Sequence, residues 1–543
     1  MMKYVCILML IITLLLLPIT SFKYSIRSKS NSISIRNHDQ DRRNLYQDRL
    51  LIYQDRLLST KKPATSLSLS TSTSSSMISS PSEPALPTTM ELLGFGLPTL
   101  GIWLLQPILS LIDTAVVGMF ASSSVITQLA AIGPGIAWID SSSYLCQFIG
   151  IATTNLYAIS LSEGDDEKSR KILSHAFFIS LIVGALLNIL QYAFAPQMVT
   201  ILSGPNAKEC INYALSYARI RSFAAIFAVP SIVAQSAFLA SKDAITPLKA
   251  VVVGALANLI GDLYFVRGLG MGLQGAAIAT TMSQIFGALY LLGEVFHRIA
   301  SNKYEGREET FISKLKKYIS IPSVNDATRF LAFCGPISFI LFAKSFLWSF
   351  TTYAISTAGT ASLAAHQITI NIFLFFVIFG DVTSQMSQTF LPAYFMTENS
   401  SLSKAEAGSK AAMKIAKLGV VLGSINSIVG FLLQYMGNFI FTSSKPIVAE
   451  MLKVPFLLGA CILPHAAMTS FEGVVLALRD TKFHVLSYLI TGIGFLLFQS
   501  YVRFKSGGIF YVWIGFLLFQ WTRLVIFSFR SQQLIALKIK DRH

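Results

Sequence analysis

The sequence predicts an all-α membrane protein, with twelve transmembrane helices in two six-helix lobes related by an internal repeat. Composition is the first reason: 53% of the 543 residues are hydrophobic and only 13% are charged, fewer charges than a soluble protein of this size carries. The second is that apolar runs of about 20 residues recur along the chain, the length that spans a bilayer as a helix. These runs lack the alternation of a membrane β-barrel, so we expect the spans to be helical.

The first 21 residues resemble a signal peptide. Lys3 precedes an apolar core from Val5 to Leu17, and small polar residues follow. The alternative, a first transmembrane helix, is disfavoured because this apolar core is short.

Residues 22–89 form a basic, Ser-rich arm that we expect to be disordered, since tracts such as Thr71–Ser80 cannot build a core. A signal peptide followed by such an arm resembles the bipartite plastid presequence of algae with secondary plastids. Asp39 and Asp41 do not fit, because transit peptides are poor in acids. The two localisations left open are the plastid envelope and the secretory route or plasma membrane.

Apolar runs and loop signals divide the remainder into an N-lobe (90–297), an inter-lobe loop (298–327), a C-lobe (328–532) and a C-terminal tail (533–543). The predicted helices are 90–118, 125–158, 172–196, 211–240, 248–266, 272–297, 328–357, 361–396, 410–441, 447–477, 482–504 and 508–532.

Loop charges support an even number of spans. Connections after even-numbered helices carry about 18 Lys and Arg residues, whereas those after odd-numbered helices carry about six. The positive-inside rule then places both ends of the core on the cytosolic or stromal-equivalent face. The net charge of +16 is therefore interpreted as orientation and lipid-headgroup contact, and with no nucleic-acid motif we expect no nucleic-acid partner.

Short motifs recur at nearly one spacing. Phe95-Gly-Leu-Pro98 is echoed by Phe333-Cys-Gly-Pro336, Gln128-Leu-Ala-Ala131 by Ser362-Leu-Ala-Ala365, and Asp243 by Asp480 within similar loops. The offsets are 238, 234 and 237 residues. Because each half holds six helices, both halves have the same orientation in the membrane, and such parallel repeats enclose a central cavity and rock against each other.

A carboxylate lies inside the fifth predicted span. Asn258 and Asp262 are four residues apart, so they share one face of a helix. A membrane-embedded carboxylate usually faces the protein interior and marks a path for an ion or a proton. The alternative is an ion pair or a structural hydrogen bond between helices, and this segment alone does not decide between them.

Several motifs, short but jointly specific, resemble those of one transporter family. They are Leu111–Gly118 at the end of the first helix, Tyr217–Arg221, the loops Lys242–Pro247 and Arg479–Phe483, Leu363–Ile368 and Asn258–Asp262. Over 90–532 the chain resembles the multidrug and toxic compound extrusion (MATE) family, within it the DinF-like branch that includes plant organic-acid effluxers.

This resemblance implies a secondary active efflux transporter that exchanges an organic solute for H+ or Na+ by alternating access. It assigns the coupling ion, or the substrate, to Asp113, Asn258 and Asp262, and a helix bend to Pro98. For the C-lobe cavity it suggests Lys344, Asp381, Gln385 and Glu472; an acid that some plant relatives carry in the seventh helix is missing here, and Lys344 is the nearby charge.

Membrane-embedded carboxylates suit exchange because a carboxylate in low dielectric takes up either a proton or a cation, so the coupling ion and a competing ligand exclude each other. If Asp113 and Asp262 converge, their mutual repulsion favours one shared proton or bound Na+, and no other metal or cofactor is expected. In the C-lobe, Glu472 or Asp381 either contacts the substrate or pairs with Lys344; both interpretations stay open.

Other function classes fit less well. A lipid or oligosaccharide flippase of related architecture would line its cavity with several basic residues, and this core has few. A prenyltransferase-type intramembrane enzyme needs a second acid-rich motif, which is absent from the sequence, so we do not expect an enzyme. The expected partners are the lipid bilayer and a small organic solute, with the protein a monomer. Acidic cavities favour organic cations, while the branch resemblance favours organic acids or phenolics.

Overall fold

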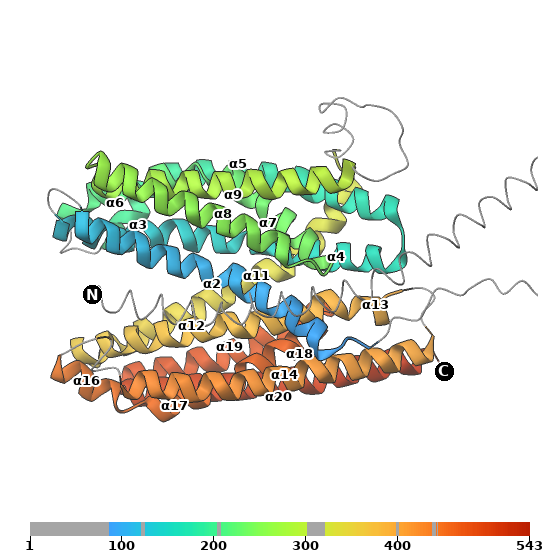
Figure 1. The fold of residues 1–543 in the computed structure, drawn as a ribbon. Helices are drawn as coiled ribbons and strands as arrows, with labels where there is room; N and C mark the ends of the chain where they lie inside the picture. The colour runs from blue at the N-terminus through green and yellow to red at the C-terminus, as the bar shows by residue number, and fades with distance from the viewer. Residues whose placement is uncertain are drawn as a thin grey trace, which may run out of the picture. The chain divides into compact units, whose positions relative to one another are not determined.

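The computed structural model describes residues 86–542, apart from 121–124, 204–207, 301–320, 398–400, 437–440 and 442–443. Every regular element in these described ranges is a helix (Figure 1). The predicted signal peptide, nearly all of the basic arm and most of the inter-lobe loop lie outside the described residues.

Two sets of helices follow the chain order. The N-terminal set comprises α2 (Thr89–Phe120), α3 (Val125–Leu145), α4 (Gln147–Glu163), α5 (Asp166–Ser203), η1 (Lys208–Cys210), α6 (Ile211–Ser222), α7 (Ala225–Ala240), α8 (Ile245–Asp262), η2 (Leu263–Gly268) and α9 (Gly272–Ala300). The C-terminal set comprises α11 (Val324–Ile355), α12 (Thr360–Phe390), α13 (Pro392–Phe395), α14 (Leu402–Tyr435), α16 (Lys445–Met451), α17 (Pro455–Ile462), α18 (His465–Ala477), α19 (Thr481–Phe504) and α20 (Ile509–Lys540).

Among the described residues, eleven helices are long and apolar enough to cross a membrane, and the bent pair α6–α7, with an angle of 51°, makes up to twelve. The all-helical, two-lobed prediction is thereby confirmed. Several boundaries differ from the predicted ones: α5 begins at Asp166 rather than 172, α14 begins at Leu402 rather than 410, and the predicted helix 211–240 is broken into α6 and α7. Two further differences have a clear physical cause. The predicted helix 447–477 is divided into α16, α17 and α18, because Pro455 and Pro464 lack the backbone N–H that a continuous helix needs. α20 continues to Lys540, beyond the predicted end at 532, because Ile535 is still buried.

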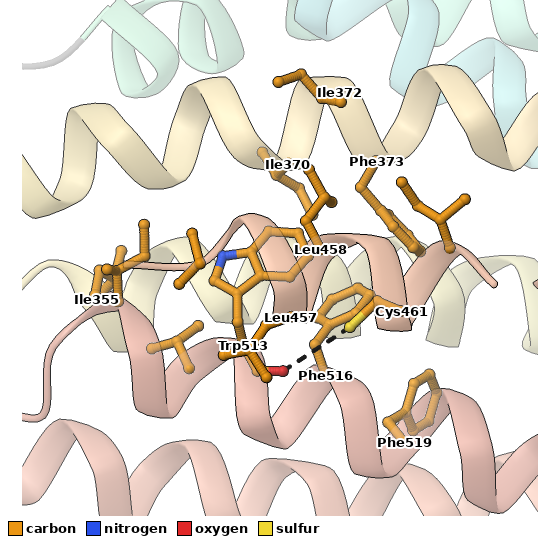
Figure 2. Close-up of a cluster of buried hydrophobic side chains, with 14 of the residues drawn as sticks. Ile355, Ile370, Ile372, Phe373, Leu457, Leu458, Cys461, Trp513, Phe516 and Phe519 are labelled. Atoms are coloured by element: carbon orange, nitrogen blue, oxygen red, sulfur yellow. Dashed lines mark hydrogen bonds between the residues drawn. The ribbon is translucent and has the colours of Figure 1, made fainter. Parts of the chain in front are cut away.

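Each lobe has its own apolar core. In the C-lobe, Trp513 and Phe516 of α20 pack against Phe373 of α12 and Leu458 of α17, and the Cys461 thiol donates to the Trp513 carbonyl at 3.9 Å (Figure 2). These inward-facing side chains hold α12, α17 and α20 together. They position the polar residues of α12 and α18.

The first helix of each repeat reaches the opposite lobe with its N-terminal half. Leu92 and Phe95 of α2 belong to an apolar cluster made mostly of C-lobe residues, including Phe390 and Ala411. In the same way, Phe330 and Cys334 of α11 belong to a cluster of N-lobe residues. Figure 1 shows α2 running from the upper bundle down to the lower one. These two helices therefore connect the lobes mechanically.

Backbone conformation supports the internal repeat. Lys242 and Arg479 occupy corresponding loops, and they adopt the left-handed region with φ of 62° and 60°. This region costs a side-chain-bearing residue about 1 kcal/mol or more. A strained backbone recurring at a spacing of 237 residues indicates that the two loops are built alike.

Candidate functional site

The first polar site is a buried cluster inside the N-lobe. Asn258 Nδ2 donates to Asp113 Oδ1 at 2.6 Å and to Asp262 Oδ2 at 2.9 Å. Thr280 Oγ1 of α9 donates to Asp113 Oδ2 at 2.8 Å. All four side chains are buried. The predicted trio therefore converges, and the amide of Asn258 bridges the two carboxyl groups.

Close helix packing makes this convergence feasible. A Cβ at Gly254 would lie 3.1 Å from the Ser283 carbonyl oxygen, and one at Gly261 would lie 2.8 Å from the Ala279 side chain. Small residues thus let α8 approach α9 closely. The polar face of α8 is thereby held against α2 and α9.

The donor set of this N-lobe cluster consists of oxygens and one amide group. Among the described residues, no Lys, Arg or His forms an ion pair with Asp113 or Asp262. The atoms Asn258 Oδ1 and Asp262 Oδ1 are buried and lack a hydrogen-bond partner in that part of the chain. Two buried acids with no basic partner hold protons or bind a small hard cation, since two unpaired negative charges are too costly in low dielectric.

The second polar site is a cavity of about 290 Å³ between the lobes. Its lining comes from both repeats: Trp103, Tyr144, Gln147, Gly150, Ile151, Thr154, Gln235, Ser236, Leu239, Ile337, Ile340, Leu341, Lys344, Ile378, Asp381, Ser384, Gln385, Gln388, Glu472, Leu476 and His484. All four predicted C-lobe residues are in this set, whereas Asp113, Asn258 and Asp262 are not. The acids that sequence reasoning assigned to the two lobes therefore occupy two separate sites, and only the C-lobe set lines the cavity.

Glu472 of α18 is fully paired within the C-lobe. Lys344 Nζ lies 2.9 Å from Glu472 Oε1, and Arg523 Nη2 lies 2.8 Å from Glu472 Oε2. His484 Nε2 is 2.9 Å from Glu472 Oε1, and Tyr488 also donates to that oxygen, at 3.3 Å. This geometry favours the ion-pair interpretation of Glu472 and Lys344 over free substrate-binding groups.

Asp381 differs from Glu472. Its carboxylate lines the cavity and has no hydrogen bond or ion pair with the described residues. Gln385 Nε2, one helical turn further along α12, lies 3.4 Å from Thr389 Oγ1. Gln388 Oε1 accepts a hydrogen bond from Asn155 Nδ2 at 2.8 Å, which links the C-lobe to the N-lobe. Asp381 is therefore the charged group of the cavity that remains available to a solute.

Sequence reasoning missed Thr280, Arg523, His484 and Tyr488. Thr280 carries no spacing signal, because it meets Asp113 only through the packing of α9 against α2. Arg523 did carry a signal: a single Arg in the apolar span 508–532 needs an acidic partner. Only the fold shows that this partner is Glu472.

Contacts between the lobes concentrate on one side of the membrane. The shared apolar cluster joins Phe95 to Phe390 with ring centroids 5.5 Å apart, and Lys242 Nζ lies 4.6 Å from the centroid of the Phe390 ring. These residues are near the basic-rich connections that follow even-numbered spans. On the opposite side, the two largest clusters each contain residues of one lobe alone.

Up to twelve membrane-spanning helices in the described part of the chain, arranged in two repeat-related lobes around a polar cavity, are typical of a membrane transporter. Comparisons with known proteins agree. The MatE family model matches residues 98–264. "Protein DETOXIFICATION 47, chloroplastic" of Arabidopsis thaliana is 34% identical over 443 residues, covering 80% of this chain and 77% of that protein. "DNA damage-inducible protein F" of Escherichia coli is 28% identical over 178 residues, covering 33% of this chain and 38% of that one.

A solved structure described as MATE in the straight conformation is similar in fold. It has a TM-score of 0.71 and 17% sequence identity, and the match covers 84% of this chain and 98% of that one. This solved structure supports the fold, and the Arabidopsis relative supports the family over most of the chain. The chain belongs to the multidrug and toxic compound extrusion family, as its motifs predicted, and is an integral multi-pass efflux transporter.

Proposed function

We propose that the protein is an antiporter that exchanges an organic solute for H+ or Na+ by alternating access. The observation that carries the proposal is the presence of two separate polar sites. One is a buried pair of acids with no basic partner, and the other is an open cavity between the lobes. Antiport needs both a place for the driving ion and a place for cargo, with a mechanical link between them.

The N-lobe cluster is the proposed site of the coupling ion. Asp113 and Asp262 hold one shared proton or bind Na+ with their carboxylate oxygens, and the free Oδ1 atoms of Asn258 and Asp262 offer further coordination. Thr280 and the Asn258 amide orient the two acids. No cofactor and no chemical change of the solute is part of this proposal.

Helix α2 is the proposed link. Its C-terminal half carries Asp113, and its N-terminal half packs against Phe390 of the C-lobe. Pro98 and Pro107 lie between these two contacts, and a proline inside a helix removes a backbone hydrogen bond and permits a bend. A change in the bonds of Asp113 on ion binding therefore alters how α2 meets the opposite lobe.

The inter-lobe contacts support a direction of opening. The Phe95–Phe390 contact joins the lobes near the basic-rich loops, while the two clusters at the other end of the described helices each belong to one lobe. With the positive-inside orientation, these contacts support a cavity that opens away from the cytosolic or stromal-equivalent face. Efflux moves the solute out of the cytosolic or stromal-equivalent compartment, and a cavity open to the opposite side suits its release there.

Plastid localisation is proposed from two observations. The first 89 residues resemble a bipartite presequence, and the Arabidopsis relative carries the word chloroplastic in its name. A fluorescent fusion of residues 1–90 should label the plastid. Labelling restricted to the secretory pathway would contradict the plastid assignment.

Reconstitution tests the transport proposal directly. Purified protein in vesicles is challenged with an imposed pH or Na+ gradient and a panel of organic amines, carboxylates and phenols. We expect gradient-dependent uptake of at least one class, lost when the gradient is dissipated. Solute uptake that is independent of both gradients, or accelerated lipid flip-flop alone, would contradict antiport and favour a flippase.

A further inference from the structure

The cavity has two walls built from equivalent positions of the repeat. On the second and eighth spans, residues at the 234-residue offset correspond to each other in pairs. Five N-lobe residues and their five C-lobe counterparts all line the cavity: Tyr144 with Ile378, Gln147 with Asp381, Gly150 with Ser384, Ile151 with Gln385, and Thr154 with Gln388.

The fourth and tenth spans repeat the same relation. At the 237-residue offset, Gln235 corresponds to Glu472 and Leu239 to Leu476, and all four line the cavity. An approximate twofold symmetry of the repeat therefore relates the two cavity walls. The chemistry of the walls, however, is not symmetric.

Charge is confined to the C-lobe wall. Lys344, Asp381 and Glu472 line the cavity from that lobe, whereas every lining residue from the N-lobe is uncharged. The positions equivalent to the two acids hold amides of similar size, Gln147 in place of Asp381 and Gln235 in place of Glu472. Among the described residues, neither of these two amides has a hydrogen-bond partner.

We propose that Gln147 and Gln235 determine specificity by binding the neutral, hydrogen-bonding end of a small amphiphilic ion whose charged end is held at the C-lobe wall. The inference rests on the proposed transport function and narrows its substrate class. A hydroxyl or carbonyl group of the solute forms a hydrogen bond with an amide that would otherwise lose its contact with water when the solute binds. A second charge at that end would find no counter-charge, and its desolvation would be uncompensated.

Apolar surface also lines the cavity between the two walls. Trp103, Leu239, Ile340 and Leu341 contribute this surface, and a volume of about 290 Å³ lies at the lower end of the range for ligand pockets. The class of ligand is therefore a small organic ion with an apolar body, one charged group and a polar group at the far end.

Binding of matched probes tests this proposal. Phenethylamine and tyramine differ by one hydroxyl at the end far from the charge, and so do phenylacetate and 4-hydroxyphenylacetate. Equilibrium binding to the full-length protein in detergent, without any gradient, should favour the hydroxylated member of the pair that binds by about 3- to 10-fold, the worth of one hydrogen bond. Gln147→Leu and Gln235→Leu should bring this ratio close to one.

Gln274→Leu is the matched control, since it makes the same change on α9 at a residue that does not line the cavity, and it should leave the ratio unchanged. A ratio near one in the native protein, or a ratio that survives both Gln147→Leu and Gln235→Leu, would overturn the proposal. Because no ion gradient is involved, a failure of ion coupling would not alter this ratio, so the two proposals fail separately.

A further variant tests the same position in case the leucine variants fail to fold. Gln147→Glu keeps the size of the side chain and adds a charge opposite Asp381. It should raise the affinity for 1,4-bis(aminomethyl)benzene relative to phenethylamine by about 10-fold, the gain from a new ion pair in a shielded site. No change in this relative affinity would mean that position 147 does not contact the solute, which overturns the assignment.

Discussion

The two acidic clusters of this protein differ in what surrounds the carboxylates. In the N-lobe, Asp113 and Asp262 share the Asn258 amide, Thr280 donates to Asp113 alone, and no basic side chain pairs with either acid in the described ranges. In the C-lobe, Glu472 is held between Lys344 and Arg523. Both clusters contain membrane-embedded acids. Only the N-lobe cluster must gain a proton or an ion for its acids to become neutral.

This difference shows why an acid in a membrane span does not by itself identify an ion path. A buried carboxylate that is matched by cations has no need of an exchangeable ion, and its role is to hold helices in place. A pair of carboxylates without cations changes its charge whenever its ion leaves. We therefore attribute coupling to the N-lobe and structural organisation to Glu472, and the following changes probe that contrast.

The largest expected effect is on stability. Glu472→Gln leaves Lys344 and Arg523 without their shared carboxylate, and breaking a buried ion pair in this way typically costs about 3–5 kcal/mol. We expect a clear fall in the thermal unfolding temperature of the purified protein. Adding Lys344→Met should recover part of the loss because it removes one unpaired charge. Unchanged unfolding in the single variant would mean that Glu472 is not structurally required.

The next effect is on coupling. Asp262→Asn removes one of the two acids, keeps the size of the side chain, and leaves the C-lobe cluster intact. Gradient-driven exchange should fall by about 100-fold, within the range of measured coupling energies, while solute affinity changes by less than about 2-fold. Vesicle transport and equilibrium binding measured on the same preparation separate these two quantities. Undiminished gradient-driven exchange would refute the assignment.

A smaller effect is expected at the cavity. Asp381→Asn removes the unpaired charge that lines the cavity, and should change the affinity for a charged solute by about 10-fold, with the sign set by the charge of that solute. Amines should bind more weakly and carboxylates more tightly. Thr389→Val, which removes a hydroxyl on the same helix, provides a control that should have little effect.

The smallest expected effect is on access to the cavity past the contact between the lobes near the basic-rich loops. Lys242 of the N-lobe contacts Phe390 of the C-lobe and lies 3.7 Å from Glu91, so Lys242→Asn weakens this closure without altering the left-handed backbone. The labelling rate of a cysteine introduced at Ser384, with the natural cysteines replaced, should rise by about 2- to 3-fold from the basic-loop side. Lys505→Asn is the matched control, because Lys505 lies over the ring of its chain neighbour Phe504. Equal rates for the native protein and both variants would contradict the proposed closure.

Much of the fold could be predicted because length and hydropathy are local properties. Apolar runs located the spans, and the offset between Ala131 and Ala365 located the repeat. Segment ends were harder, since Pro464 divides α17 from α18 within a run that is apolar throughout. A burial pattern that depends on neighbouring helices, as at Ile535, is not visible in a single segment.

The N-lobe trio of Asp113, Asn258 and Asp262 was predictable because acids inside membrane spans are rare and because these residues lie in recognisable sequence motifs. The pairing of Glu472 was only half predictable. Lys344 was a named alternative partner, but Arg523 and His484 come from helices whose approach depends on the whole C-lobe. The division of the acids between the two lobes was predicted, but which set lines the inter-lobe cavity depends on helix packing, which sequence spacing does not encode.

The central claim is that the coupling ion binds in the N-lobe rather than at the C-lobe acids. Measuring the protons or Na+ released when a solute binds to the purified protein in weak buffer tests it directly. We predict that release disappears in the Asp113→Asn/Asp262→Asn double variant and persists in Asp381→Asn. Release that persists in the double variant and disappears in Asp381→Asn would contradict the account.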